Sequence, residues 1–384
     1  MINLWLLIVL IVLLALLMAP PVFYFVWMKN ISKRSWMLKV NSDYTPAVSL
    51  IVSTYNEAVV ISKKLMNIQK MNYPEDKLEV IIVDSASTDN TLSICSDFLK
   101  KSNFRFPIHL ISEEKRLGKS HALNFSLRYA TGEIIATSDA DAMWEPNALK
   151  IAVSFFADES VGAVTGKEKL ENLEKSVSTQ SEALYRNFYY TLRLGESKIH
   201  STLIFQGELA LYRRIIFDKF EDRPGYSDDV GTVINIISKG YRCIFVPEAI
   251  FYDAAPFSVG GRLTLKSRRA EHLVAGIVRS FRLKMEKKIM LSWSVVFFNF
   301  YLHVISPFLL IFTLLTAATV YVIDFHFLWF LVFILVPLFI LKKPRVFAFS
   351  YLTSNIALIM GLLPYITRKR SVVWKKIDEM RLKS

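Results

Sequence analysis

Hydrophobic residues are distributed unevenly along this chain and divide it into three parts. The first 28 residues carry no charged side chain, and Lys29 is the first charged residue. From about 46 to 256, short apolar runs alternate with polar turns, as in an ordinary soluble domain. Apolar residues dominate again over about 291–366. Because about 20 apolar residues suffice to cross a bilayer, residues 1–28 are predicted to form a transmembrane helix.

A cleaved signal peptide is the alternative interpretation of residues 1–28. The apolar run is longer than the apolar core of a signal peptide, and no basic segment precedes it. Basic residues follow it instead, at Lys29, Lys33, Arg34 and Lys39. By the positive-inside rule, this pattern places the N-terminus outside the cell and the next domain in the cytoplasm.

The middle part has the pattern of an α/β domain. Short β-branched runs predict strands, and the segments between them predict helices. The strands are expected over 48–52, 78–83, 108–112 and 133–141, and the helices over about 57–70, 89–101 and 120–130. This alternation predicts right-handed crossovers and a mostly parallel sheet, which binds ligands at the carboxyl ends of its strands. Polar clusters follow three of these strands, at 55–57, 84–89 and 139–141.

Two acids, Asp139 and Asp141, follow the fourth predicted strand one residue apart. Mg²⁺ and Mn²⁺ prefer carboxylate and phosphate oxygens and bind through one or two protein carboxylates. A plain surface turn is the alternative for an Asp-x-Asp sequence. The apolar strand before the pair and the acidic ends of the neighbouring strands favour a ligand site.

A second acidic pair, Asp228 and Asp229, precedes a run of apolar residues at helical spacing. That run ends at Gly240, and a strand is predicted over 241–247. The pair therefore lies at the N-terminus of a buried helix, where helix capping is the alternative role. Capping needs one acid, so the pair favours a catalytic base, which must lie near the reacting hydroxyl.

The remaining segments are predicted to lie in or on a membrane. Residues 257–290 carry Leu273, Ile277 and Phe281 at spacing four, which predicts an amphipathic interfacial helix. A basic helix of the soluble domain is the alternative. Residues 291–366 are expected to hold two crossings and a re-entrant, interfacial or third crossing segment, followed by a basic tail at 367–384. The expected segments are 293–323, interrupted at Pro307, then 325–341 and 346–366.

The chain has 47 Lys and Arg against 34 Asp and Glu, a formal net charge of +13. Much of this excess lies beside the apolar segments, so attraction to a membrane surface accounts for it. The basic residues are not interleaved with aromatic residues on an exposed sheet, which argues against a nucleic-acid partner.

Six motifs together resemble the membrane-bound family 2 glycosyltransferases, which have a GT-A fold. The resemblance runs from about Pro46 to Arg282 and lies in the order and spacing of the motifs. They are STYNE (53–57), VDSASTDNT (83–91), GKSHALN (118–124), SDAD (138–141), QGELALYRR (206–214) and SDDVGTVINIISKGYR (227–242). The fold class implied is α/β, with a GT-A domain flanked by transmembrane and interfacial helices.

The resemblance also implies roles for individual residues. A nucleotide-diphosphate sugar, UDP- or GDP-linked, would be bound by Tyr55, Glu57, Asp84, Lys119, Asp139 and Arg269. Asp141, with Asp139, would hold Mg²⁺ or Mn²⁺ on the diphosphate. Asp229, with Asp228 beside it, would supply the general base of an inverting transfer. Gly207 and Glu208 would contact the acceptor.

The chain departs from the family pattern at three places. Ser85 replaces the second acid of Asp-Asp-x-Ser-x-Asp, and Asp228 replaces the Glu of Glu-Asp. The Gln-x-x-Arg-Trp motif of processive members corresponds to residues 266–270, in which Arg269 is kept but Lys266 and Ala270 replace Gln and Trp. Without the stacking Trp, we expect a single transfer to a lipid or polyprenyl-linked saccharide at the cell membrane. A processive synthase that extrudes its polymer and a non-catalytic scaffold are the alternatives.

Overall fold

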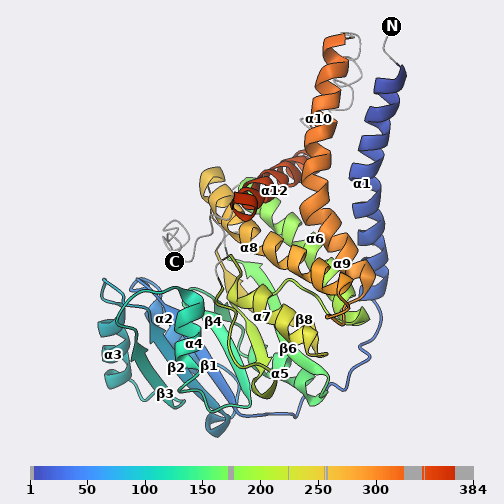
Figure 1. The fold of residues 1–384 in the computed structure, drawn as a ribbon. Coiled ribbons are helices and arrows are strands. Elements are labelled where there is room, and N and C mark those ends of the chain that lie inside the picture. Colours follow the sequence, from blue (N-terminus) through green and yellow to red (C-terminus); the bar gives the residue numbers. More distant parts are fainter. Residues whose placement is uncertain are drawn as a thin grey trace.

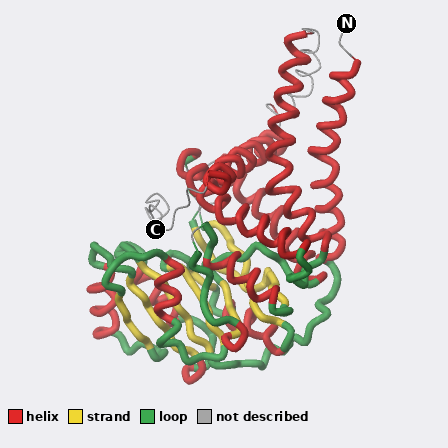
Figure 2. The backbone as a smooth tube through the Cα atoms, in the orientation of Figure 1, coloured by secondary structure: helices red, strands yellow, loops and turns green. Residues whose placement is uncertain are grey.

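The computed structural model describes residues 4–171, 177–223, 225–254, 256, 258–323, 340 and 342–367. An eight-stranded sheet, in the order β3-β2-β1-β4-β7-β6-β8-β5, lies at the centre of one part of the molecule. Long helices extend from one end of this part (Figures 1 and 2). The predicted site residues lie on this sheet, on the segments that follow its strands and on the helices packed beside it.

The first half of the sheet is parallel, as predicted. It consists of β1 (Val48–Thr54), β2 (Leu78–Asp84), β3 (Ile108–Ser112) and β4 (Ile134–Asp139). Thr54 pairs with Asp84, and Asp84 pairs with Ser112. The carboxyl ends of these strands are therefore aligned, which brings the polar segments after them to one edge of the sheet.

The second half of the sheet is mixed. β5 (Met143–Trp144), β6 (Val161–Leu170), β7 (Ala210–Arg213) and β8 (Arg242–Asp253) form it. β7 is antiparallel to β4 and β6, β6 is parallel to β8, and β5 is antiparallel to β8. The strand predicted to end at residue 247 continues to Asp253. Pro247, which has no N–H to donate, falls where the pairing of β6 with β8 shifts register between Thr165 and Lys167.

Helices cover both faces of the sheet because alternate strand residues point to opposite faces. Leu50 faces the side covered by α2 (Ile61–Gln69), α3 (Thr91–Lys101) and α5 (Ala148–Val153). Ile51 faces the side covered by α4 (Lys119–Ser126) and α7 (Asp228–Ser238). Single 3₁₀ turns occupy Glu75–Lys77, Ser154–Ala157 and Arg214–Ile216.

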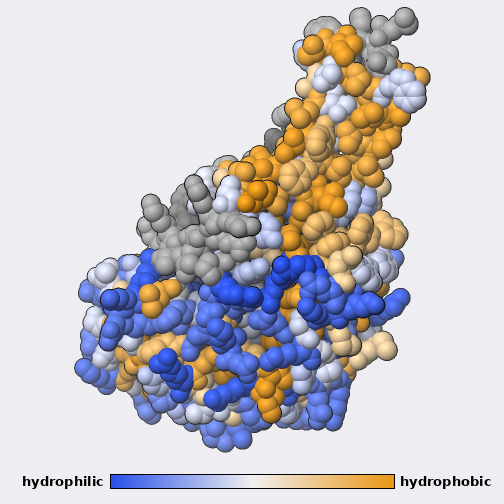
Figure 3. Space-filling model, in the orientation of Figure 1, coloured by the Kyte–Doolittle hydropathy of each residue, from blue (hydrophilic) through white to orange (hydrophobic). Residues whose placement is uncertain are grey.

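Two helical stretches in the described residues are long and apolar enough to cross a membrane: α1 (Leu4–Ser32), and Trp293–Ile323. The second is built from α9 (Trp293–Phe300), a π-helical turn (Tyr301–Ile305) and α10 (Ser306–Ile323). The interruption predicted at Pro307 is wrong, because the π turn before it accommodates the missing N–H without ending the helix. Figure 3 shows a largely hydrophobic surface over these projecting helices.

α1 packs on α6 (Val177–Ile199), which also contacts β8 of the sheet. Tyr24 Oη donates a 2.7 Å hydrogen bond to Glu196 Oε1 inside this contact. Gly195 lets the helices approach closely, since a Cβ there would lie 2.7 Å from the Met28 carbonyl oxygen. The helix pair is therefore held by buried packing and by a buried hydrogen bond.

α8 (Val259–Met285) occupies most of the segment predicted to be amphipathic. Its apolar face packs on the protein: Leu273 and Phe281 contact the core beside α7, and Ile277 is fully buried. The spacing of these apolar residues therefore reflects the packing of α8 on the domain. A position of α8 at the membrane interface stays a prediction.

α12 (Lys342–Thr367) contains the last predicted membrane segment and packs on α8 and α6. It is not one of the two candidate spans in the described residues. An interfacial or third crossing position for it stays a prediction. The predicted second crossing lies almost wholly outside the described residues, as do residues 368–384 of the basic tail.

Candidate active site

The side chain of Lys119 connects two of the predicted acids. Its Nζ lies 2.5 Å from Asp139 Oδ1 and 3.7 Å from Asp228 Oδ2. Lys119 is the first residue of α4, Asp139 the last of β4 and Asp228 the first of α7. Burial would lower the pKa of Lys119, but the two carboxylates raise it above its ordinary value. Three elements thus bring a protonated amine between two acids.

Asp228 and Asp229, the acidic pair at the start of α7, have different surroundings. Ser227 is the N-cap and accepts a hydrogen bond from the Val230 N–H at 3.2 Å, and Asp229 Oδ1 accepts from the same N–H at 2.6 Å. Asp229 therefore does help to cap α7, as the alternative interpretation of the acidic pair predicted. Burial raises the pKa of Asp228 to about 6, helped by Asp229 and Asp139 and opposed by Lys119.

The two predicted acceptor residues lie beside this cluster. A Cβ on Gly207 would come within 3.2 Å of Lys119 Nζ and 3.6 Å of Asp228 Oδ2, so the glycine leaves these groups accessible. The next residue, Glu208, accepts a 2.7 Å hydrogen bond from Arg269 Nη2 of α8. Burial raises the pKa of Glu208, against the opposing charge of Arg269. Arg269 is thus connected through Glu208 to the cluster formed by Lys119, Asp139 and Asp228.

Asp141 lies in the turn after β4, and a buried lysine holds this turn. Lys64 Nζ donates to Ser138 Oγ at 2.7 Å and to the Ala142 carbonyl oxygen at 2.5 Å. Burial raises the pKa of Asp253, at the end of β8, and the charge of Asp141 raises it further. Asp141 and Asp253 thus repel each other electrostatically, and a cation beside them would relieve this repulsion.

The described residues contain no group of three or more His, Cys, Asp or Glu side chains arranged to hold a metal ion. A site for Mg²⁺ or Mn²⁺ needs only one or two protein carboxylates, which act together with substrate phosphates and water. Asp139 and Asp141 fit that donor set.

The predicted nucleotide residues lie on two loops that are bonded to each other. Asp84 is buried; its Oδ2 accepts from the Ser87 N–H at 2.9 Å and its Oδ1 from Ser87 Oγ at 2.5 Å. Ser87 Oγ in turn accepts from the Asn56 N–H at 2.8 Å. Glu57 is also buried, and its N–H donates to Thr91 Oγ1 at 2.8 Å. Asp84 therefore fixes the loop geometry, and its contact with a nucleotide stays a prediction.

Several residues at this edge were not predicted from the sequence. Arg116 stacks over the ring of Tyr55, with the guanidinium carbon 3.7 Å from the ring centroid. Ser85 Oγ, which replaces the missing acid, donates to Glu113 Oε2 at 2.6 Å, and Glu113 also contacts His121 Nδ1. Glu113 and Arg116 follow the third strand, so the strand-end argument would have found them. No sequence signal distinguishes Lys64 from a surface lysine.

Comparisons with known proteins concern the family and the fold of the chain. The Glycosyl transferase family 2 model matches residues 49–220. The structure of the mannosyltransferase PcManGT from Pyrobaculum calidifontis, in complex with GDP-Man and Mn²⁺, is similar with a TM-score of 0.80 and 32% identity. That similarity covers 95% of this chain and 100% of the other.

Two curated relatives point to the same family. The probable glycosyltransferase YdaM of Bacillus subtilis (strain 168) is 29% identical over 73% of this chain and 67% of its own length. The poly-beta-1,6-N-acetyl-D-glucosamine synthase of Staphylococcus epidermidis (strain ATCC 35984) is 23% identical over 68% of this chain and 62% of its own length. The chain therefore spans about three fifths of that synthase. The family model and the similarity to PcManGT over almost the whole chain place the chain in glycosyl transferase family 2, with a GT-A fold.

Proposed function

We propose that the protein is a membrane-bound, inverting glycosyltransferase that moves one sugar from a nucleoside diphosphate donor to a lipid-linked acceptor. The observation that carries the proposal is the position of Lys119 between Asp139 and Asp228. One amine thereby connects the acid expected at the donor with the acid pair expected at the acceptor.

The donor is proposed to be a GDP- or UDP-sugar. Tyr55, Glu57 and Asp84 would seat the nucleotide, because they lie on the two bonded loops at the carboxyl ends of β1 and β2. The GDP-Man and Mn²⁺ bound to PcManGT, at 32% identity, support a nucleotide sugar and a divalent cation. Asp139 and Asp141 would hold Mg²⁺ or Mn²⁺, which when bound neutralises charge that develops on the departing diphosphate.

Asp229 is proposed to accept the proton of the acceptor hydroxyl. The acceptor oxygen attacks the anomeric carbon from the face opposite the nucleotide, and the bond from that carbon to the diphosphate oxygen breaks with its electron pair. Lys119 and Arg269 supply positive charge beside the leaving group, and fixed charges of this kind stabilise a transition state strongly. Gly207 leaves room for the acceptor, and Glu208 lies beside it.

The acceptor is proposed to be held in the membrane. Two helical stretches have the length and composition to cross a bilayer, and basic residues after the first favour a cytoplasmic catalytic domain in a multi-pass protein of the cell membrane. A processive synthase is the second candidate, supported by the relative from Staphylococcus epidermidis. Ala270 at the position of the stacking Trp favours a single transfer.

A nucleotide-release assay tests the proposal. The full-length protein, purified into lipid nanodiscs, is incubated with GDP- and UDP-sugars, a membrane lipid extract and Mn²⁺. We expect one nucleoside diphosphate to be released, in a reaction that needs the extract and stops when the cation is chelated. If no nucleoside diphosphate is released with any donor, the proposal of an active enzyme is wrong. If the product is a long polymer and not an acceptor lengthened by one sugar, the processive synthase is supported.

A further inference from the structure

The segment that leads into the acidic pair, residues 221–227, is fixed through the side chain of Glu221. The segment ends at Ser227, the N-cap of α7, so its position determines where Asp228 and Asp229 lie. Only 4% of the Glu221 side chain is exposed. A buried charge is costly unless it is paired, so the partners of this carboxylate show what holds the segment in place.

The first partner belongs to the segment itself. Glu221 Oε1 accepts from the Arg223 N–H at 3.2 Å and from Arg223 Nε at 2.7 Å, and Oε2 accepts from Nη2 at 2.6 Å. Burial would raise the pKa of Glu221, but the hydrogen bonds and charge of Arg223 and the charge of Arg279 lower it to about 2. The carboxylate therefore stays ionised at neutral pH.

The second partner, Arg279, comes from α8. Its Nη1 lies 3.1 Å from Glu221 Oε2, and its Nη2 donates a 2.6 Å hydrogen bond to Asn235 Oδ1 of α7. One guanidinium thus binds both the segment before α7 and the body of α7. The two elements that carry the acidic pair are thereby attached to the same point on α8.

Glu221 also contacts the start of α7 directly. Its N–H donates to Thr232 Oγ1 at 2.9 Å. A Cβ on Gly231 would lie 2.3 Å from Glu221 Cγ, so the glycine lets this side chain cross the first turn of the helix. The carboxylate therefore lies against the same helical turn that carries Asp228 and Asp229.

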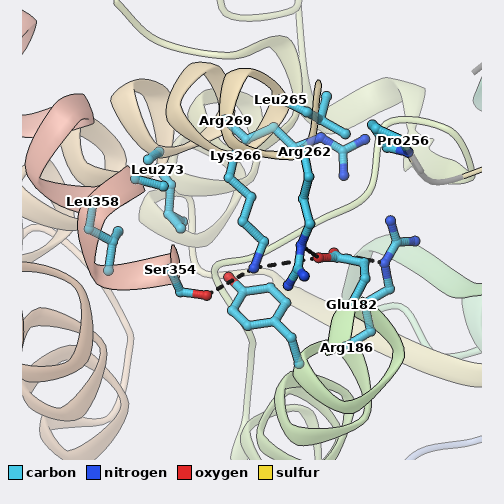
Figure 4. Close-up of a pocket in the computed structure, with 13 residues that line it drawn as sticks. Glu182, Arg186, Pro256, Arg262, Leu265, Lys266, Arg269, Leu273, Ser354 and Leu358 are labelled. Carbon is cyan, nitrogen blue, oxygen red and sulfur yellow. Dashed lines mark hydrogen bonds and ion pairs between the residues drawn. The ribbon is translucent and has the colours of Figure 1, made fainter. Parts of the chain in front are cut away.

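α8 is itself held along its length by ion pairs. Figure 4 shows Arg262 and Lys266 of α8 directed at Glu182 of α6, at 3.1 and 3.4 Å. Further along, Arg269 pairs with Glu208 at 2.7 Å. The helix is thus attached to several parts of the molecule, and it provides a fixed support for the start of α7.

An ion pair gives this contact a direction that apolar packing would not. Replacing a buried ion pair by apolar side chains of similar volume is often neutral or stabilising, so stability alone does not call for one. A bidentate pair of guanidinium and carboxylate, however, fixes the relative orientation of the two groups. Orientation matters at a reacting group, where a displacement of about 1 Å can lower a rate about 10²-fold.

We propose that Glu221 is a positioning residue of the transfer reaction: together with Arg279 it holds the first turn of α7 against α8 and so fixes Asp229 beside the acceptor hydroxyl. Glu221 acts through Asp229 and not on the substrates themselves. The inference rests on the proposed function, because it concerns the base assigned there.

Amide hydrogen exchange of the full-length protein in nanodiscs tests whether Glu221 holds this turn. Glu221→Gln keeps the size of the side chain but removes its charge, and it should raise exchange over residues 228–232 roughly tenfold or more. Arg279→Gln should do the same. The double variant should be little worse than either single one, since both remove the same contact. Asp222→Asn is the adjacent control, because that side chain is 40% exposed and pairs with Lys219.

Single-turnover transfer measures the consequence for the reaction. Glu221→Gln should lower the transfer rate roughly tenfold to hundredfold and leave donor and Mn²⁺ affinity unchanged. Arg279→Lys keeps the charge and should recover part of the rate that Arg279→Gln loses. Unchanged exchange over residues 228–232 overturns the proposal. A Glu221→Gln protein that unfolds at a lower temperature but transfers at the wild-type rate also overturns it, because the role of Glu221 is then structural only.

The failure of this inference can be told apart from the failure of the proposed function. If Asp229→Asn abolishes transfer and Glu221→Gln does not lower it, the inference is wrong and the proposed function stands. If the wild type transfers no sugar from any donor while exchange rises in Glu221→Gln, the proposed function is wrong, and Glu221 holds α7 for stability alone.

Discussion

The Nζ atom of Lys64 lies 2.5 Å from the carbonyl oxygen of Ala142 in the interior of the protein, where burial lowers the pKa of the amine to about 7 against the charges of Asp139 and Asp141. Lys64 is fully buried, and it also donates to Ser138, so it holds both ends of the turn that carries Asp139 and Asp141. A side chain from α2 thereby fixes the turn on which the proposed metal site depends.

Lys64→Met should therefore affect both stability and activity. The substitution leaves the Ser138 hydroxyl and the Ala142 carbonyl group without their buried donor, which costs about 1–3 kcal/mol in the free energy of unfolding. We also expect weaker Mn²⁺ binding, because Asp141 is no longer held in place. Denaturant unfolding and Mn²⁺ titration measure the two effects. Lys63→Met is the matched control, since that neighbouring side chain is 46% exposed. If the two variants have the same free energy of unfolding and the same Mn²⁺ affinity, Lys64 does not hold the turn.

Asp229→Asn tests the proposed base. Loss of general base catalysis should lower the rate of transfer by about 10²–10⁴-fold. The amide oxygen can still accept from the Val230 N–H, so the helix should keep its start and the binding of donor and Mn²⁺ should stay nearly unchanged. Single-turnover transfer and donor titration separate these effects. Asp222→Asn, at a side chain 40% exposed that pairs with Lys219, is the control. Full transfer by Asp229→Asn would remove Asp229 from the mechanism.

The Arg269–Glu208 pair should be coupled energetically. Arg269→Gln leaves the buried Glu208 carboxylate without its closest cation, at a cost of about 1–3 kcal/mol that is reduced because the guanidinium is 44% exposed. Adding Glu208→Gln should restore part of this stability, with an interaction energy of about 0.5–3 kcal/mol in the double-mutant cycle. Denaturant unfolding of the four proteins measures it. Strict additivity would mean that the two side chains act independently.

The contact between α8 and α12 should tolerate no side chain at Gly361. A Cβ there would lie 2.7 Å from backbone atoms of Ala270 and Glu271, so Gly361→Ala must separate the helices and should cost about 1–3 kcal/mol. Gly260→Ala is the matched control in α8, because its Cβ would meet no atom within 4 Å. That change should be neutral or stabilise by up to about 1 kcal/mol, since it removes the glycine's backbone freedom. Thermal unfolding ranks the two variants.

The parallel half of the sheet could be predicted because each strand is a short apolar run ended by polar residues. β6 and β7 could not, because β7 has four residues and its direction is set by its pairing with β4. The spacing of Leu273 and Ile277 predicted a helix with one apolar face, but not that this face packs on the domain rather than on lipid. Periodicity reports which side of a helix is apolar and not what covers that side.

The members of the candidate site could be proposed from strand ends and motif order, but their connections could not. Lys64 has the sequence context of a surface lysine and is nonetheless buried beneath the turn it holds. Lys266 Nζ of α8 lies 2.9 Å from Ser354 Oγ of α12 and 3.4 Å from Glu182 Oε2 of α6, three helices far apart along the chain. Such contacts depend on tertiary packing, which no local sequence pattern specifies.

The bond between Tyr24 and Glu196 has a mechanical consequence. α6 packs both on β8 of the sheet and on α1, so buried contacts connect the sheet to the apolar helices. Under the proposed function, side-chain packing would then set the height of the active site above the bilayer, whatever the length of the linker at 33–47. Acceptors would be selected by reach: a saccharide whose terminal hydroxyl stands too close to the lipid, or too far from it, would go unmodified.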